Sequence, residues 1–168
     1  MLVVTNHPTP SESMLNEPVP DFELPATGGK IFRLSAARGK PLILYFYPKD
    51  STPGCTTEAR QFRGLYPQFA ALGAEVCGIS RDSIKSHENF KAKQGLPFEL
   101  LSDAEEKACH LFGVIKMKNM YGKQVRGIER STFVLDGQGR LRREWRGVKV
   151  AGHAQEVLEF ARELCLAT

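Results

Sequence analysis

An apolar run from Leu42 to Tyr47, bounded by Pro41 and Pro48, constrains the fold of this chain more than any other segment. Such residues favour β-structure, and a strand that is apolar on both faces is typical of a parallel sheet covered by helices on both sides. A Pro-Gly turn follows the run, and Cys55 then opens a segment whose apolar residues recur at helical spacing up to residue 72. We therefore expect Cys55 in the first turn of a helix, just beyond the carboxyl end of a buried strand.

This position has a chemical consequence for Cys55. A cysteine in the first turn of a helix faces backbone N–H groups without intrahelical partners and the positive end of the helix dipole. A thiol with the ordinary pKa of about 8.5 is mostly protonated near neutrality, and positive charge nearby favours its thiolate. The sequence therefore indicates a reactive thiolate at Cys55.

Length and composition indicate one globular domain. The chain has 168 residues, of which 42% are hydrophobic, enough for a sizeable core. We predict a flexible N-terminal leader over residues 1–17, where proline and small polar residues occur without periodicity, and a single domain over residues 18–168. The 23 basic and 19 acidic residues are interspersed, so a net charge of +4 does not indicate a nucleic-acid partner. Neither a secretory signal nor a run of membrane-spanning length is recognisable, so we expect a cytoplasmic protein without a membrane partner.

Periodicity and turn residues divide the domain into alternating strands and helices. Strands are predicted near residues 20–25, 31–34, 42–47, 74–80, 98–101, 131–135 and 141–146, and helices near residues 55–72, 87–93, 104–112 and 153–164. This order predicts an α/β fold, a three-layer sandwich with a central mixed sheet. Such sheets bind ligands beyond the carboxyl ends of their strands, which is where we expect Cys55.

The segment around Cys55 resembles the active-site signature of the peroxiredoxins, which Pro48, Thr52 and Cys55 match. The longer segment from Tyr45 to Glu58 is similar to the bacterioferritin-comigratory, or Q-type, branch of that family. Further matches follow in the same order over roughly residues 18–165: Pro20-Asp-Phe22, Gly39-Lys40, Ser86-His87, Leu101-Ser-Asp103, Tyr121-Gly-Lys123 and Gly127-Ile-Glu-Arg-Ser-Thr-Phe133. The resemblance implies a thioredoxin-like fold and thiol-dependent reduction of hydrogen peroxide and organic hydroperoxides.

The resemblance also implies roles for four residues. Cys55 would attack one peroxide oxygen and become a sulfenic acid, and Arg130, which matches the active-site arginine of the family, would supply a permanent positive charge. The Thr52 hydroxyl and the N–H groups near Gly54 and Cys55 would hold the peroxide oxygens, while Pro48 would shield the pocket from water. Taken singly, Thr52 is a turn or cap residue and Pro48 a break in the strand, but their register with the family series favours the catalytic reading.

The chain departs from the Q-type branch where a second cysteine would regenerate the thiol. Relatives carry this resolving cysteine either five residues after the first or in the helix after the next strand, and here Arg60 and Lys91 occupy these positions. We therefore predict a one-cysteine cycle, in which an external thiol from a thioredoxin, glutaredoxin or glutathione system reduces the sulfenic acid.

The other three cysteines leave an alternative open. Cys77 lies in an apolar strand and Cys109 in an apolar helix, so both are expected in the core, although an atypical two-cysteine cycle through Cys109 or Cys77 remains the alternative. Cys165 lies near the C-terminus, where a partner or another subunit could meet it. From the resemblance we expect a monomer or a weak homodimer.

Two further classes of function stay open at this point. A disulfide oxidoreductase is disfavoured because Cys55-Thr-Thr-Glu58 lacks the second cysteine of a CxxC motif. A redox-sensing adaptor or holdase is not separated from an enzyme by the motif, because one fold hosts several functions. The cysteine and histidine spacing is not that of a zinc site, so we expect neither metal nor cofactor. Four histidines have no partner at catalytic spacing along the chain and receive no role: His7, His87, His110 and His153.

Overall fold

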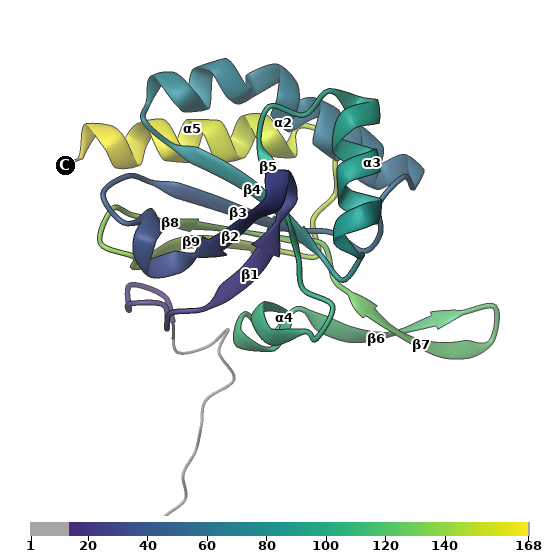
Figure 1. Ribbon diagram of the computed structural model, residues 1–168. Coiled ribbons are helices and arrows are strands. Elements are labelled where there is room, and N and C mark those ends of the chain that lie inside the picture. Colours follow the sequence, from purple (N-terminus) through teal and green to yellow (C-terminus); the bar gives the residue numbers. More distant parts are fainter. Residues whose placement is uncertain (1–13, 168) are drawn as a thin grey trace, which may run out of the picture.

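In the computed structural model, which describes residues 14–167, seven strands form one mixed sheet in the order β2-β1-β5-β4-β3-β8-β9 (Figure 1). The three central strands β5, β4 and β3 are parallel to one another, and the outer strands add antiparallel on both sides. The strands are β1 (Glu23–Ala26), β2 (Lys30–Arg33), β3 (Leu42–Phe46), β4 (Glu75–Ser80), β5 (Glu99–Ser102), β8 (Ser131–Leu135) and β9 (Leu141–Arg146).

The apolar run forms β3, near the middle of the sheet, and every residue of this strand is buried. Its side chains alternate between two cores. Leu44 and Phe46 belong to the core on one face of the sheet, whereas Ile43 and Tyr45 belong to the core on the other. The prediction of a strand covered on both faces is confirmed.

Helices cover the two faces unequally (Figure 1). α2 (Pro53–Ala71), α3 (Ile84–Gln94) and α5 (His153–Leu166) place apolar residues in one core. α4 (Lys107–Leu111) and the short 3-10 helix η2 (Leu34–Ala37) place theirs in the opposite one, and a second 3-10 helix, η1 (Thr27–Gly29), connects β1 and β2. The three-layer α/β sandwich, a thioredoxin-like fold with a mixed sheet, is therefore as predicted.

Two strands were not predicted. β6 (Ile115–Met120) and β7 (Lys123–Ile128) form a separate hairpin that extends away from the body of the domain (Figure 1). Most of their residues are exposed or half-buried, so the alternation of apolar and polar residues that marks a half-buried strand is missing. The two-residue turn at Tyr121 and Gly122, with φ of 53° and 77°, is the local signal that indicates the hairpin.

Helix ends also differ from the predicted ones. α3 begins at Ile84 because the Ser83 hydroxyl caps it by accepting a hydrogen bond from the Ser86 amide at 3.1 Å. α4 is shorter than predicted because Glu106, which precedes it, has a left-handed φ of 61°.

Part of the predicted leader lies beside the sheet. Residues 1–13 of the leader, with His7, lie outside the described residues, while Met14 is 5% exposed and Leu15 forms a bridge with Leu141 of β9. The helices among residues 14–167 include none that is both long and apolar enough to cross a bilayer.

Candidate active site

Cys55 lies in the first turn of α2, directly after the loop that leaves β3. Pro53 occupies the start of the helix, where its fixed φ is favourable and its missing N–H costs nothing. The carbonyl of Thr52 accepts the first helical hydrogen bond, from the Thr56 amide at 2.9 Å, so the N–H groups of Gly54 and Cys55 precede the intrahelical ladder. The Cys55 residue is 2% exposed. Its sulfur therefore sits at the positive end of a long helix, as predicted.

Sheet pairing explains how Arg130 reaches this helix. β8 runs antiparallel to β3, with Ser131 opposite Phe46, so the residue before β8 lies at the carboxyl end of β3. From there Arg130 Nη2 lies 3.5 Å from Cys55 Sγ. The structure thus brings together two predicted residues that are far apart in sequence.

A third residue, Glu58, joins this pair and was missed as a site residue by the sequence reasoning. Arg130 Nη1 donates to Glu58 Oε1 at 2.6 Å, and Glu58 is 1% exposed. Burial raises the pKa of Glu58 to about 7, against the opposing effect of the Arg130 charge. Glu58 Oε2 is buried and has no hydrogen-bond partner among the described residues. The signal in the sequence was the spacing of three residues from Cys55, which puts both on one helix face.

Gly54 allows the guanidinium to lie close to the helix. A Cβ atom added at Gly54 would lie 3.2 Å from Arg130 Nη2. Any larger residue at this position would therefore press on the atom that contacts the Cys55 sulfur.

The other two predicted residues lie in the connecting loop. The Thr52 hydroxyl donates to the Lys49 carbonyl at 2.8 Å and closes the turn before α2. Pro48 directly follows the last residues of the buried run and is half-buried. The hydrogen bond from Thr52 to Lys49 holds the loop, and within residues 14–167 the Thr52 hydroxyl is not hydrogen-bonded to Cys55 or Arg130.

Two histidines have partners that spacing along the chain did not indicate. His153 Nε2 lies 2.8 Å from Thr132 Oγ1, and burial lowers the pKa of His153 to about 4. His87 Nδ1 lies 2.7 Å from Asp50 Oδ2. Both contacts join elements far apart in the chain, which is why the sequence alone did not predict them.

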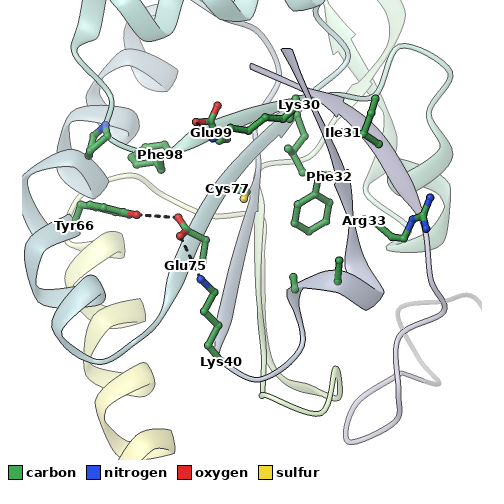
Figure 2. Close-up of a pocket in the computed structure, with 15 residues that line it drawn as sticks. Lys30, Ile31, Phe32, Arg33, Lys40, Tyr66, Glu75, Cys77, Phe98 and Glu99 are labelled. Atoms are coloured by element: carbon green, nitrogen blue, oxygen red, sulfur yellow. Dashed lines mark hydrogen bonds and ion pairs between the residues drawn. The ribbon is translucent and has the colours of Figure 1, made fainter. Parts of the chain in front are cut away.

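Cys77 and Cys109 lie in the core on the face opposite Cys55. Cys77, Glu75 and Glu99 are among the residues that line a cavity of about 430 Å³ (Figure 2). Burial, followed by the nearby carboxylates, raises the pKa of the Cys77 thiol, and burial together with Asp103 does the same for Cys109. Both are core residues, and their environments oppose thiolate formation. Cys165 is half-buried in α5, with its sulfur 3.7 Å from the Leu72 carbonyl oxygen.

Comparison with known proteins identifies the family. Residues 15–144 match the model of the AhpC/TSA family. The chain is 55% identical over 150 residues to peroxiredoxin Bcp of Xanthomonas campestris, covering 88% of this chain and 94% of that protein. It is 48% identical over 150 residues to peroxiredoxin Bcp of Bacillus subtilis, covering 89% and 96%.

Solved structures agree with this assignment. The structure of the Xanthomonas campestris bacterioferritin comigratory protein, solved in a study of its alkyl peroxide reduction activity, superposes with a TM-score of 0.82 at 54% identity, covering 86% of this chain and 92% of that one. A PrxQ mutant of Xylella fastidiosa gives a TM-score of 0.83 at 47% identity, covering 89% and 93%. Together with the fold and the thiol at the start of α2, these matches show that the chain belongs to the AhpC/TSA family, in its Bcp or PrxQ peroxiredoxin branch, and is a thiol-dependent peroxidase.

Proposed function

We propose that Cys55 is the thiol that peroxide oxidises, and that Arg130, Thr52 and Pro48 form its catalytic surroundings. The observation that carries the proposal is the contact of 3.5 Å between Arg130 Nη2 and Cys55 Sγ at the N-terminus of α2. A guanidinium and a helix N-terminus both favour a negatively charged sulfur. The same groups stabilise the charge that moves onto the leaving oxygen.

The proposed reaction is a displacement at oxygen. The Cys55 thiolate attacks one oxygen of a hydroperoxide, an S–O bond forms and the O–O bond breaks. The other oxygen leaves as an alkoxide or hydroxide and takes up a proton, and Cys55 becomes a sulfenic acid. Thr52 and the N–H groups of Gly54 and Cys55 orient the peroxide, while Pro48 limits the access of water. Both hydrogen peroxide and organic hydroperoxides are proposed substrates.

We propose further that an external thiol reduces the sulfenic acid. One thiol forms a mixed disulfide with Cys55 and releases water, and a second thiol exchanges with it to return the Cys55 thiol. The central sheet supports this one-cysteine cycle, because Cys55 belongs to the core on one face and Cys77 and Cys109 to the core on the other. An internal disulfide to either would require one of the two sulfurs to leave its core.

The occupants of the two usual resolving positions support the same cycle. Arg60 Nε donates to Gln94 Oε1 at 3.0 Å, and Lys91 Nζ donates to Glu99 Oε1 at 2.8 Å. Two cysteines were mutated separately to serine in structures of the Xanthomonas campestris relative. If the first of these cysteines matches Cys55, the same number of residues further along this chain leads from Cys55 to Lys91. The proposed reductant is a thioredoxin, glutaredoxin or glutathione system of a reducing cytoplasm, acting on a monomer or weak homodimer.

The proposal is tested by intact-mass analysis after one equivalent of hydrogen peroxide. Three proteins are compared with a sulfenic-acid trap present: the wild type, the Cys55→Ser variant, and a variant with Cys77→Ser, Cys109→Ser and Cys165→Ser together. We expect rapid trapping in the wild type and in the triple variant, and none in Cys55→Ser. Turnover with glutathione or thioredoxin should be unchanged in the triple variant.

Other outcomes replace parts of the proposal. Loss of two hydrogens in the wild type, absent from the triple variant, would replace the one-cysteine cycle by a two-cysteine cycle. Trapping that persists in Cys55→Ser would overturn the assignment of Cys55.

A further inference from the structure

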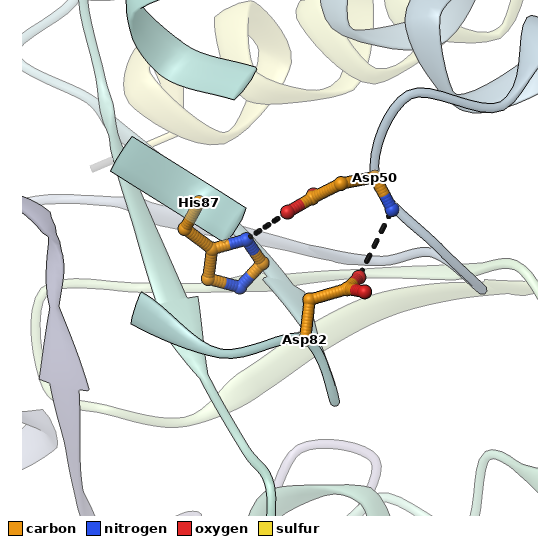
Figure 3. Close-up of side chains that lie close together, drawn as sticks. All are labelled: Asp50, Asp82 and His87. Carbon is orange, nitrogen blue, oxygen red and sulfur yellow. Dashed lines mark hydrogen bonds and ion pairs between the residues drawn. The ribbon is translucent and has the colours of Figure 1, made fainter. Parts of the chain in front are cut away.

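A buried polar network surrounds Asp50, in the loop between β3 and α2. The Asp50 carboxylate accepts hydrogen bonds from the Tyr47 hydroxyl at 2.6 Å and the Ser86 hydroxyl at 2.8 Å, and His87 Nδ1 lies 2.7 Å from it. The Asp50 amide donates to Asp82 Oδ2 at 2.9 Å, as Figure 3 shows. We call these five residues the Asp50 network. It joins the loop to the end of β3, to the segment after β4 and to α3.

The Asp50 network is not arranged to hold a cation. Asp50, Asp82 and His87 offer ligand atoms within 4.8 Å of one another. However, His87 Nδ1 is engaged by the Asp50 carboxylate, and His87 Nε2 lies 2.9 Å from the Leu101 carbonyl oxygen, so neither ring nitrogen is free to bind a metal ion. Burial acts to raise the pKa of Asp50, but the hydrogen bonds from His87 and Tyr47 outweigh it and lower the pKa.

The loop held by this network leads directly to the candidate active site. Ser51 follows Asp50 with a left-handed φ of 63°, and the Thr52 hydroxyl closes the turn on the Lys49 carbonyl. α2 then begins at Pro53, and Cys55 lies in its first turn. The position of Asp50 therefore fixes where α2 starts and where the Cys55 sulfur meets Arg130.

A buried contact between a carboxylate and an imidazole is weak evidence for stability alone, because well-packed apolar residues are often as stable. The hydrogen bonds of the Asp50 network instead converge on one loop. Cys55 is 2% exposed, so a thiol reductant, whose sulfur must contact Cys55 Sγ, needs that loop and the first turn of α2 to move. Peroxide attack instead requires that the loop stays in place, because the thiolate, Arg130 and the helix N–H groups must keep their relative positions.

We propose that Asp50 and His87 are positioning residues that hold the β3–α2 loop in its peroxide-reactive arrangement and so set the balance between oxidation of Cys55 and its reduction by thiols. This inference rests on the proposed function of Cys55. The Asp50 network connects α3 to the β3–α2 loop. The strength of the contact between Asp50 and His87 therefore governs how often this loop moves and exposes the Cys55 sulfur to a thiol reductant.

The test separates the two half-reactions. Rate constants for peroxide oxidation of Cys55 and for thiol reduction of its sulfenic acid are measured, per active thiol, for wild type, His87→Leu and His87→Asn. His87→Leu removes both ring nitrogens and so the contact with Asp50, and we expect oxidation to slow by about tenfold or more while thiol reduction accelerates. His87→Asn keeps one donor toward Asp50 and should lie between His87→Leu and wild type.

The matched control lies on the same helix. Lys91→Gln breaks the contact with Glu99 at 2.8 Å without touching the loop, and both rate constants should stay at the wild-type values. If His87→Leu does not fold, Tyr47→Phe and Ser86→Ala each remove one hydrogen bond to Asp50 and should give smaller changes in the same directions.

Two results would overturn the inference. One is wild-type rate constants in folded His87→Leu, or in both single-bond variants if His87→Leu does not fold. The other is an equal fall of both rate constants, which a general structural defect would produce. Failure of the proposed function is recognised separately, because wild-type oxidation would then not depend on Cys55.

Discussion

At the scale of single residues, the candidate site depends on one close approach. Arg130 contacts both the Cys55 sulfur and the buried Glu58 carboxylate, so its guanidinium is held between two side chains of the same helix. Gly54 leaves the space for this arrangement. The absence of a side chain is therefore as much a part of the site as the charged groups.

Gly54→Ala should separate activity from stability. The added methyl group would lie 3.2 Å from Arg130 Nη2 and displace it, so we expect slower oxidation of Cys55 by peroxide, by severalfold to about tenfold. Stability should stay equal or rise by up to about 1 kcal/mol, because alanine favours a helix. Stopped-flow oxidation and urea unfolding measure the two effects.

Gly64→Ala is the matched control for this substitution. Gly64 lies in the same helix, and a Cβ atom there has no neighbour within 4 Å among the described residues. It should show the stability effect and a wild-type rate. A wild-type rate in Gly54→Ala as well would contradict the importance of the close approach.

At the scale of elements, α3 is fixed at both ends. Near its start, His87 contacts Asp50 of the β3–α2 loop. Near its end, Gln94 accepts from Arg60 of α2, and Lys91 contacts Glu99 of β5. The two positions at which the resemblance to the Q-type branch would place a resolving cysteine therefore hold cations that tie α3 to its neighbours.

Lys91→Cys should restore an internal route for resolution. The substitution removes the contact with Glu99 and places a second thiol at a position proposed above for a resolving cysteine. The sulfenic acid proposed for Cys55 can then form a disulfide when α3 and the start of α2 open. After one equivalent of peroxide, intact mass should show loss of two hydrogens instead of gain of one oxygen. Lys93→Cys, at an exposed position of the same helix, is the control and should only gain oxygen. An identical result for both variants would contradict the prediction.

For the protein as a whole, two buried ionisable groups change the folding stability in opposite directions as the pH rises. Glu58 has a folded pKa of about 7 against an ordinary value of 4.5, so its contribution to stability is complete below 4.5 and is lost as the pH rises through 7. His153 has a folded pKa of about 4 against an ordinary 6.5, so its contribution is present above 6.5 and is lost as the pH falls through 4.

Urea unfolding of Glu58→Gln and His153→Gln across this pH range should reveal both effects. The stability of the wild type relative to Glu58→Gln should fall as the pH rises from 4.5 to 7. Relative to His153→Gln, it should fall as the pH decreases from 6.5 to 4. Differences that do not vary with pH would show that these groups have the same pKa in the folded and unfolded chains.

Two features of this protein follow from its sequence, namely the layers of the fold and the position of Cys55 at the start of a helix. The run from Leu42 to Tyr47 is apolar on both faces, which requires cover on both sides of the sheet, and the Pro-Gly turn sets Cys55 at the start of a helix. Local periodicity and capping encode these features. The β6–β7 hairpin was missed because its exposed strands carry no apolar alternation.

Which distant residues meet around Cys55 depends on how the strands pair and how the helices pack. Antiparallel pairing of β8 with β3 delivers Arg130 to Cys55, and the packing of α3 delivers His87 to Asp50. The separation of Cys55 from Cys77 and Cys109 by the sheet likewise appears only in the fold. The reason is physical: periodicity specifies which face of an element is buried, but contacts between polar side chains depend on register and packing across the sheet.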